Sequence, residues 1–394
     1  MKQGILRLLF FLFLALLLAG GFAAYDAYRF LSTPASDQPQ DIIISIAPGA
    51  TFDRVAWDLK KAGAITDVDR FRILAYAQDA LGRVKAGEFQ INTGWTPEQV
   101  LRQITEGQAI LYRLSVREGL TWWETARAVE AQGFARYEDF KAVIHDPDFL
   151  REHNIPFANA EGFLFPETYL LKKPRNPLDR QQAYDVASTM VRMFWKKSEP
   201  LWQALPKKAA PIAAQEPPAG AMSSPAPTVN ATAAASTNAT APAASASGPR
   251  TPAEVDPEAL RRLVTLASLV EKETGVPAER GLVAGVYANR LRLGMLLQCD
   301  PTIIYGIGEN FSGAIRRSQI DDPKNRYNTY QHPGLPPGPI ASPGLDSLRA
   351  AAAPDQHDFL YFVATGVDDG HTFSKTLNEH NKAVQVYRSR IRNN

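Results

Sequence analysis

The sequence has almost no cysteine and no long run of charge of one sign. Its single cysteine, Cys299, excludes an internal disulfide bond, and with it the disulfide-stabilised scaffolds of small secreted proteins. The 43 basic and 41 acidic side chains nearly cancel, and neither half of the chain carries a basic block. Proteins that bind duplex nucleic acid need a basic face, so this composition argues against nucleic acid as a partner.

The sequence also lacks the clusters that hold metals or activate a thiol. His371 and His380 are spaced unlike a zinc-binding pair, and no cysteine cluster accompanies them. No motif pairs a histidine with Cys299, which we therefore predict to be a small, half-buried residue and not a nucleophile. Lys272 is predicted to point away from the apolar face of its helix, which argues against a Schiff base with pyridoxal phosphate. We therefore expect no metal and no organic cofactor.

By contrast, the N-terminus carries a long hydrophobic run. Lys2 and Arg7 precede an uncharged segment over residues 8–25, whose about 18 residues at ~1.5 Å each just cross the hydrocarbon of a bilayer. The positive charge before the run places residues 1–7 in the cytoplasm and the rest of the chain outside. We predict an uncleaved single-pass anchor in the inner (cytoplasmic) membrane. The alternative is a cleaved signal peptide, for which the alanines at 23, 24 and 27 offer only an imperfect site.

Three similar segments follow the anchor, and each reads as a strand, a glycine turn, a threonine, a helix and a closing glycine. They are IIISIAPGATFDRVAWDLKKAG, FQINTGWTPEQVLRQITEG and YRLSVREGLTWWETARAVEAQG. The threonines can cap the helices through their side-chain oxygens; they are Thr51, Thr96 and Thr121. The closing glycines are expected to be left-handed; they are Gly63, Gly107 and Gly133. Because such units are too small to be separate domains, we predict α+β modules over residues 40–112 and 113–208.

Two further segments differ from these repeats. EGFLFPETYLLKK, residues 161–173, predicts a strand and a turn, whose acids either lie exposed beside an aromatic core or belong to a site. Residues 209–252 are nearly all Ala, Pro, Ser, Thr and Gly, which predicts a disordered insert because such a composition buries too little surface to offset its ordering entropy.

The stretch LASLVEKETG, residues 266–275, ends an apolar helical run in two acids. The buried stripe of this helix is marked at helical spacing by Leu263, Leu266 and Val270. Glu273 continues the apolar stripe, whereas Glu271 lies toward the side of the stripe. Desolvation raises the pKa of a carboxyl group and keeps it protonated near neutrality, as a general acid requires. The alternative is a helix end with both acids in water.

Start and stop signals delimit this helix, and a second helix and loops are predicted after it. Asp256 is suited to cap its start, Pro257 to its first position, and Gly275 to its stop. A second helix is predicted from residue 277 to about residue 292. The rest is predicted to be loop-rich with short strands, including LQCDPTIIYGIG and YNTYQHPGLPPGPIASPG, of the kind that lines sites on a rigid scaffold.

Taken in order, seven motifs resemble the endolytic murein transglycosylase family, the YceG-like proteins. They are EGFLFPETY, SLVEKET, VYANRLRLGM, LQCDPTIIYGIG, YNTY, GLPPGPIASPG and LYFVATGVDDGHTF. The resemblance implies a membrane-anchored α+β protein with a LysM-like module and a catalytic domain, here over residues 253–394. It implies that the protein cuts peptidoglycan glycan strands internally between N-acetylmuramic acid and N-acetylglucosamine, leaving a 1,6-anhydro end. It places the acid/base on Glu273 and suggests cell-wall synthases as partners.

Polar residues of the same motifs are predicted to bind the sugars. They are Gln298, Asp300, Thr302, Tyr305, Asn328 and Tyr330, with Glu167 as a second cleft carboxylate and Glu271 as the alternative acid. Each of the loop residues could instead shape a turn through its own backbone. A non-catalytic, wall-binding scaffold would explain the anchor and the repeats equally well, and a hydrolytic muramidase would share the fold.

Overall fold

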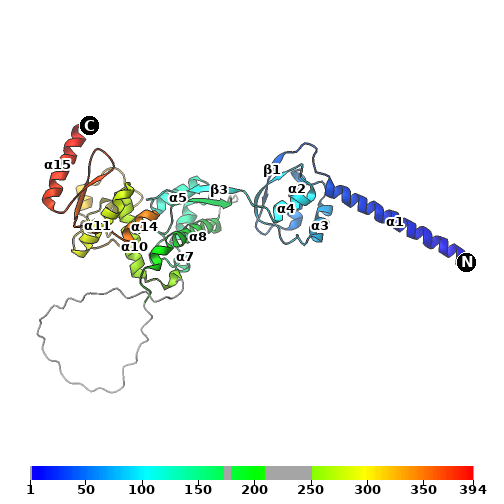
Figure 1. Cartoon of the computed structure of the whole chain (residues 1–394), viewed down its shortest axis with the longest axis horizontal. Helices are drawn as coiled ribbons and strands as arrows, with labels where there is room; N and C mark the ends of the chain where they lie inside the picture. Colours follow the sequence, from blue (N-terminus) through cyan, green and yellow to red (C-terminus); the bar gives the residue numbers. More distant parts are fainter. Residues whose placement is uncertain (1, 173–178, 209–250, 394) are drawn as a thin grey trace, which may run out of the picture. The chain divides into compact units, whose positions relative to one another are not determined.

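The computed structural model describes residues 2–172, 179–208 and 251–393, with side chains from residue 10 on (Figure 1). The predicted insert at 209–252 therefore lies outside the described residues, except for its last two positions. The chain divides into two compact units, one formed by Met1–Ser115 with Thr168–Leu178 and the other by Val116–Glu167 with Asp179–Asn394. Both units contain helices and antiparallel strands, which confirms the predicted mixed α+β class.

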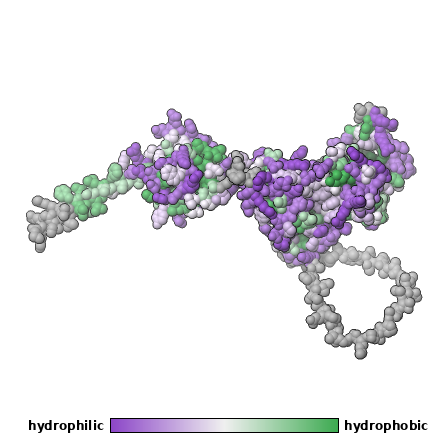
Figure 2. Space-filling model, turned by 180° about the vertical axis from the view of Figure 1, so that it is seen from behind, coloured by the Kyte–Doolittle hydropathy of each residue, from purple (hydrophilic) through white to green (hydrophobic). Residues whose placement is uncertain are grey.

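The N-terminal helix α1 (Lys2–Ser32) is long and apolar enough over Phe10–Ser32 to cross a membrane, and its mean hydropathy there is 1.9. Figure 2 shows its described outer surface as largely hydrophobic. This fits the predicted single-pass anchor. The helix continues beyond the predicted end at residue 25, because Phe30 near its C-terminus is only 7% exposed and packs into the core of the first unit.

The first unit places helices on one face of a two-stranded sheet. Strand β1 (Asp41–Ile46) pairs antiparallel with β2 (Gly87–Asn92), so that Ile44 faces Phe89. The helices are α2 (Phe52–Lys61), α3 (Val68–Ala77) and α4 (Pro97–Thr105). Alternate strand residues point into the core, as the period of a strand requires; they are Ile44, Ile46, Phe89 and Ile91. Helix α3 was not predicted, although Asp67 caps it by accepting from the Arg70 N–H.

The predicted threonine caps are confirmed. Thr51 accepts a hydrogen bond from the Arg54 N–H at the start of α2. Thr96 and Thr121 form reciprocal capping boxes at α4 and at α5 (Trp122–Ala131). Pro97 occupies the first turn of α4, where its missing N–H leaves no bond unmade.

The closing glycines behave in two different ways. Gly63 and Gly133 have φ of 74° and 77°, as predicted for left-handed helix ends. The prediction is wrong for Gly107, which does not have a positive φ. A side chain there would place Cβ 2.3 Å from the Gln103 carbonyl oxygen, so glycine is required by a close approach of the backbone.

The third sequence repeat is divided between the units. Its strand, β3 (Leu111–Ser115), pairs antiparallel with β4 (Thr168–Lys172) in the first unit, whereas its helix α5 belongs to the second. Strand β4 confirms the strand predicted within residues 161–173. The LysM-like assignment and the domain boundaries at 112, 208 and 253 stay predictions.

The second unit is mainly helical. After α5 it contains α6 (Tyr137–Ile144), α7 (Pro147–Glu152), α8 (Arg180–Lys197), α9 (Glu199–Gln203) and a 3-10 turn (Pro252–Glu254). It continues with α10 (Pro257–Glu273), a 3-10 turn (Pro277–Glu279), α11 (Arg280–Arg292), α12 (Asp300–Ile307), α13 (Arg317–Ile320) and α14 (Leu345–Ala352). The chain ends in an antiparallel pair, β5 (Tyr361–Ala364) and β6 (His371–Ser374), and in α15 (Leu377–Asn393).

Helix α10 begins as predicted and ends differently. Asp256 accepts from the N–H groups of Glu258 and Ala259, and Pro257 is the first helical residue. The predicted stop at Gly275 is wrong, because Thr274 already leaves the helix in an extended conformation with ψ of 130°. The Thr274 hydroxyl then accepts from the Val276 N–H, which fixes the exit of the chain.

The part of the chain expected to be loop-rich with short strands contains four helices among its described residues: α12, α13, α14 and α15. Residues 300–307 form α12, because Pro301 is tolerated in a first helical turn and Ile303 is fully buried on the inner face. Helix α15 covers the end of the chain, while the short strands β5 and β6 are as expected.

Candidate active site

Glu273 is the last residue of α10, where the buried stripe of that helix reaches a partly exposed surface. Leu263, Leu266 and Val270 are all buried, as the helical spacing predicted. Glu273 itself is partly exposed, in contrast to the buried Val270 one turn earlier and the exposed Lys272. The helix therefore delivers this carboxyl group to the edge of an apolar core.

Two neighbouring groups hold the Glu273 carboxyl. The hydroxyl of Tyr287 on α11 donates to Oε1 at 2.8 Å. The thiol of Cys299 also hydrogen-bonds to Glu273. Cys299 is 1% exposed, so the prediction of a half-buried residue was wrong: the thiol is packed beneath the acid.

Burial raises the pKa of Glu273, and the nearby acid Asp300 adds to this effect. The hydrogen bonds from Cys299 and Tyr287 and the proximity of His371 act in the opposite direction, because they favour the charged form. The net direction is upward. Burial therefore favours the protonated form of Glu273, while two donors are in place to stabilise its carboxylate.

The Cys299 thiol is positioned by a network between two segments of the chain. The Cys299 N–H donates to Oγ1 of Thr329 at 2.9 Å, and the Thr302 hydroxyl donates to the Cys299 carbonyl at 2.6 Å. Gln298, just before it, has φ of 52°, a left-handed conformation that is uncommon for a residue other than glycine. Arg290 on α11 supports this turn by donating to the Leu297 carbonyl at 2.8 Å.

The predicted sugar-binding residues divide into two groups here. Thr302 and Asn328 are fully buried, and the Asn328 amide donates to backbone carbonyls of the 319–322 segment. Their polar groups are engaged within the protein, which makes them positioning residues for the loop. Gln298 and Asp300 are exposed, and the Tyr330 hydroxyl donates to Asp300 at 2.6 Å. Asp300 raises the pKa of Glu273, and Glu273 in turn raises the pKa of Tyr330, so the structure brings both residues close to the acid.

Glu271 makes different contacts from Glu273. Its Oε2 accepts from the Gly344 N–H at 3.1 Å and from the Ser347 hydroxyl at 2.6 Å. These donors lie at the start of α14, where a negative charge is favourable. Glu271 therefore joins the end of α10 to the start of α14 through these two hydrogen bonds, and this structural engagement disfavours it as the alternative acid.

Tyr305 belongs to a second cluster, around a buried acid that sequence reasoning missed. Glu161 is 1% exposed and accepts from the Trp122 N–H at 2.9 Å. The Tyr305 hydroxyl hydrogen-bonds to the same carboxyl group. The Tyr305 ring stacks on the ring of Trp123, with 5.1 Å between the ring centroids. Burial raises the pKa of Glu161 to about 8. The alternative in which the acids of residues 161–173 lie exposed beside an aromatic core is therefore wrong for Glu161.

Glu167 lies directly before β4, and its carboxylate pairs with Lys197 of α8 at 3.1 Å. Its role as a second cleft carboxylate stays a prediction. Among the residues that the structure describes, no group of three or more histidine, cysteine or acidic side chains is placed to hold a metal ion.

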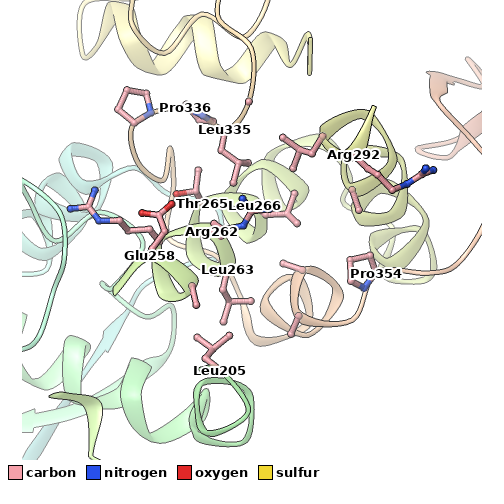
Figure 3. A pocket seen from close by; sticks show the side chains of 18 residues that line it. Leu205, Glu258, Arg262, Leu263, Thr265, Leu266, Arg292, Leu335, Pro336 and Pro354 are labelled. Carbon is pink, nitrogen blue, oxygen red and sulfur yellow. The ribbon is translucent and has the colours of Figure 1, made fainter. Parts of the chain in front are cut away.

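A pocket of about 790 Å³ lies at the other end of α10 (Figure 3). Its walls are apolar with charged residues among them, including Leu263, Leu266, Leu291, Leu335, Arg262 and Glu258. Neither Glu273 nor Asp300 nor Tyr330 lines it. The pocket is thus separate from the candidate acid.

The chain belongs to the YceG-like family, which it matches over residues 44–386. It is 27% identical over 387 residues to a Bacillus subtilis (strain 168) protein named endolytic murein transglycosylase, with 94% of this chain and 91% of that one covered. A Streptococcus pneumoniae (strain D39) protein of the same name is 26% identical over 408 residues, with 95% and 64% covered. A crystal structure of a YceG-like protein from Listeria monocytogenes matches with a TM-score of 0.49 and 23% identity. The match covers 88% of this chain and 99% of that one.

The family resemblance drawn from the motifs is therefore confirmed. Three residues of the site were not found from the sequence: Tyr287, Arg290 and Thr329. Tyr287 and Arg290 lie within the motif VYANRLRLGM, three positions apart and so on one face of a helix, which is the signal that could have paired them with the 297–302 turn.

Proposed function

We propose that the chain is a murein transglycosylase that cuts within glycan strands, with Glu273 acting first as acid and then as base. The observation that carries the proposal is a single carboxyl group at the end of an apolar helix face, with a raised pKa and two hydrogen-bond donors. Its support is membership of a family in which the related Bacillus and Streptococcus proteins are named endolytic murein transglycosylases.

In the first step, protonated Glu273 donates its proton to the glycosidic oxygen between N-acetylmuramic acid and N-acetylglucosamine. The bond from that oxygen to C1 of the muramic residue breaks, and the acetamido oxygen of the same sugar stabilises the positive charge at C1. Tyr287 and Cys299 stabilise the carboxylate as it forms, because both donate to it. Asp300 opposes early loss of the proton by raising the pKa of Glu273.

In the second step, the Glu273 carboxylate takes the proton from the C6 hydroxyl of the same muramic residue. The freed oxygen attacks C1 and closes a 1,6-anhydro ring, so no water is added and Glu273 regains its proton. The two reacting groups belong to one sugar, and this tethering supplies much of the rate enhancement. We propose that Asp300, Tyr330 and Gln298 contact sugar hydroxyl groups, because they lie near Glu273 and because Gln298 and Asp300 are exposed.

The proposed place of action is the outer side of the cytoplasmic membrane. Helix α1 fits a single-pass anchor, and its positive N-terminal flank favours an extracytoplasmic position for both units. Peptidoglycan strands are then the substrate, and cell-wall synthases are the partners that the family resemblance suggests.

The test is to incubate purified peptidoglycan with the full chain in detergent and to analyse the soluble fragments by mass spectrometry. We expect glycan fragments of several disaccharides that end in anhydromuramic acid. Fragments that carry an added water would indicate a hydrolytic muramidase. Binding to the wall without release of fragments would indicate the scaffold function.

A prediction about Cys299 follows from its contact with Glu273. Replacing Cys299 by valine removes a donor that favours the carboxylate, so the pKa of Glu273 should rise further. Activity is lost as pH rises through this pKa, and the descending limb of the rate–pH profile should therefore move to higher pH. Cys299→Ser keeps a donor and should leave the limb nearly unchanged. Equal profiles for valine, serine and the native chain would show that the thiol does not act on the acid.

A further inference from the structure

The C-terminal end of helix α1, the proposed membrane anchor, enters the core of the first unit. Phe30, near the C-terminus of α1, is 7% exposed and shares a hydrophobic cluster with the strands and helices of that unit. Just beyond the helix, the Ser36 N–H donates to the Thr93 carbonyl at 3.2 Å. Because α1 continues without a break to Ser32 and Phe30 packs into the core, the first unit is joined to the span by a continuous helix.

Asp26 marks the level at which α1 leaves the hydrocarbon. It is the first ionisable side chain after the apolar run, apart from Tyr25, and a charged carboxylate is costly inside a bilayer. Its carboxylate pairs with Arg70 of α3 at 2.9 Å. Arg70 is thereby held at the level of the lipid headgroups, and α3 lies at the side of the unit from which α1 departs (Figure 1).

The outer face of α3 exposes two large hydrophobic side chains. Ile73 and Tyr76 are 67% and 76% exposed, whereas Phe71 and Leu74 on the opposite side are buried. Tyr76 follows Arg70 by six residues, so at ~1.5 Å per residue the two lie within about 9 Å along the helix. The interfacial layer of a bilayer is on the order of 5–8 Å thick on each side. Ile73, three residues or about 4.5 Å from Arg70 along the helix, therefore lies within that thickness, and the Tyr76 side chain, which slants toward the helix N-terminus, can reach it.

We propose that the outer face of α3, carried by Ile73 and Tyr76, rests in the headgroup layer of the membrane that α1 spans. The inference rests on α1 being the anchor and does not depend on the reaction at Glu273. Tyrosine is enriched at this depth, because its ring is apolar and its hydroxyl is polar. Tyr25 and Tyr28 on α1, which flank Asp26, are 64% and 69% exposed and belong to the same level.

A lipid surface fits this face better than a protein partner does. The span brings the membrane to the Asp26–Arg70 pair through the covalent chain, so the face meets lipid without a second binding event. Charged residues border the apolar pair on α3, as expected for a helix lying at an interface: Asp69 and Arg72 pair with each other at 2.9 Å. Two contacts with the membrane, the span and α3, would hold the first unit in one orientation.

The test uses the full chain reconstituted in lipid vesicles, with single cysteines introduced by Ile73→Cys or Tyr76→Cys and labelled with an environment-sensitive fluorophore. The native Cys299 is buried, and the unmodified chain measures its background labelling. The matched control is Ile43→Cys, because Ile43 is 60% exposed but lies on strand β1. Lipids that carry a quencher on the headgroup or deep in the acyl chain report the depth of each label.

We expect a blue shift and strong quenching by the headgroup quencher at positions 73 and 76, and neither at position 43. A further Ile73→Asp change should lower the quenching at position 76. Equal quenching at all three positions would mean non-specific adsorption and would overturn the proposal. A blue shift at 73 and 76 without quenching by lipid would mean that protein covers this face, and would overturn it as well.

Discussion

Replacing Glu273 by glutamine is expected to lower the rate of glycan cleavage by roughly 10²–10⁴-fold, the range that a positioned general acid contributes. The amide cannot donate the proton that the glycosidic oxygen needs, and it cannot accept one from the C6 hydroxyl. Its shape is that of the native side chain, and its oxygen can still accept from Tyr287, so the fold should persist. The measurement is the initial rate of anhydromuramic ends formed by the native and Glu273→Gln chains.

Glu271→Gln is the matched control, because the two acids lie two residues apart on the same helix. This change weakens the bonds from Gly344 and Ser347 at the start of α14. We expect it to lower the free energy of unfolding by about 1 kcal/mol, the scale of a typical hydrogen bond, and to leave the rate within a few-fold of native. If Glu271→Gln lost activity while Glu273→Gln kept it, the roles assigned to the two acids would be reversed.

The second large effect is expected at Glu161, whose pKa is about 8 in the folded chain against an ordinary value of 4.5. The folded state therefore binds a proton that the unfolded state has released between these two values. The resulting stabilisation is fully present below pH 4.5 and is lost as pH rises toward 8. A shift of this size corresponds to at most about 4–5 kcal/mol in the free energy of unfolding.

Thermal unfolding of the second unit between pH 5 and pH 8 measures this dependence. We expect the native chain to lose stability across this window and the Glu161→Gln chain to lose much less. Glutamine keeps an oxygen that can accept from the Trp122 N–H, so the local fold should be preserved. Parallel slopes for the two chains would show that Glu161 is not the group that titrates.

Local signals in the sequence predicted a large part of the fold. Thr51, Thr96, Thr121 and Asp256 each start a helix, because their short side chains place an oxygen within reach of the free N–H groups of the first turn. The same holds for Glu273: helical spacing alone placed it on the buried stripe of α10, and the structure raises its pKa by burial. These features depend on neighbours a few residues away.

Features that depend on distant neighbours were not predictable in this way. Gly107 needs glycine because of the Gln103 carbonyl, and Cys299 is buried because Thr329, thirty positions further on, accepts its N–H. Glu161 stands beside aromatic residues in the sequence, yet its burial depends on Tyr305 and Trp122 from other helices. Periodicity cannot report such contacts, since it describes only one element at a time.

The most direct test of the central claim is to run the cleavage reaction in water enriched in ¹⁸O and to weigh the new muramic ends. If Glu273 transfers the proton of the C6 hydroxyl and that oxygen closes the ring, the ends must form without ¹⁸O, and they must be absent from the Glu273→Gln reaction. Ends that carry ¹⁸O would mean that water attacks C1. That result would contradict the ring-closing mechanism and would indicate a glycoside hydrolase.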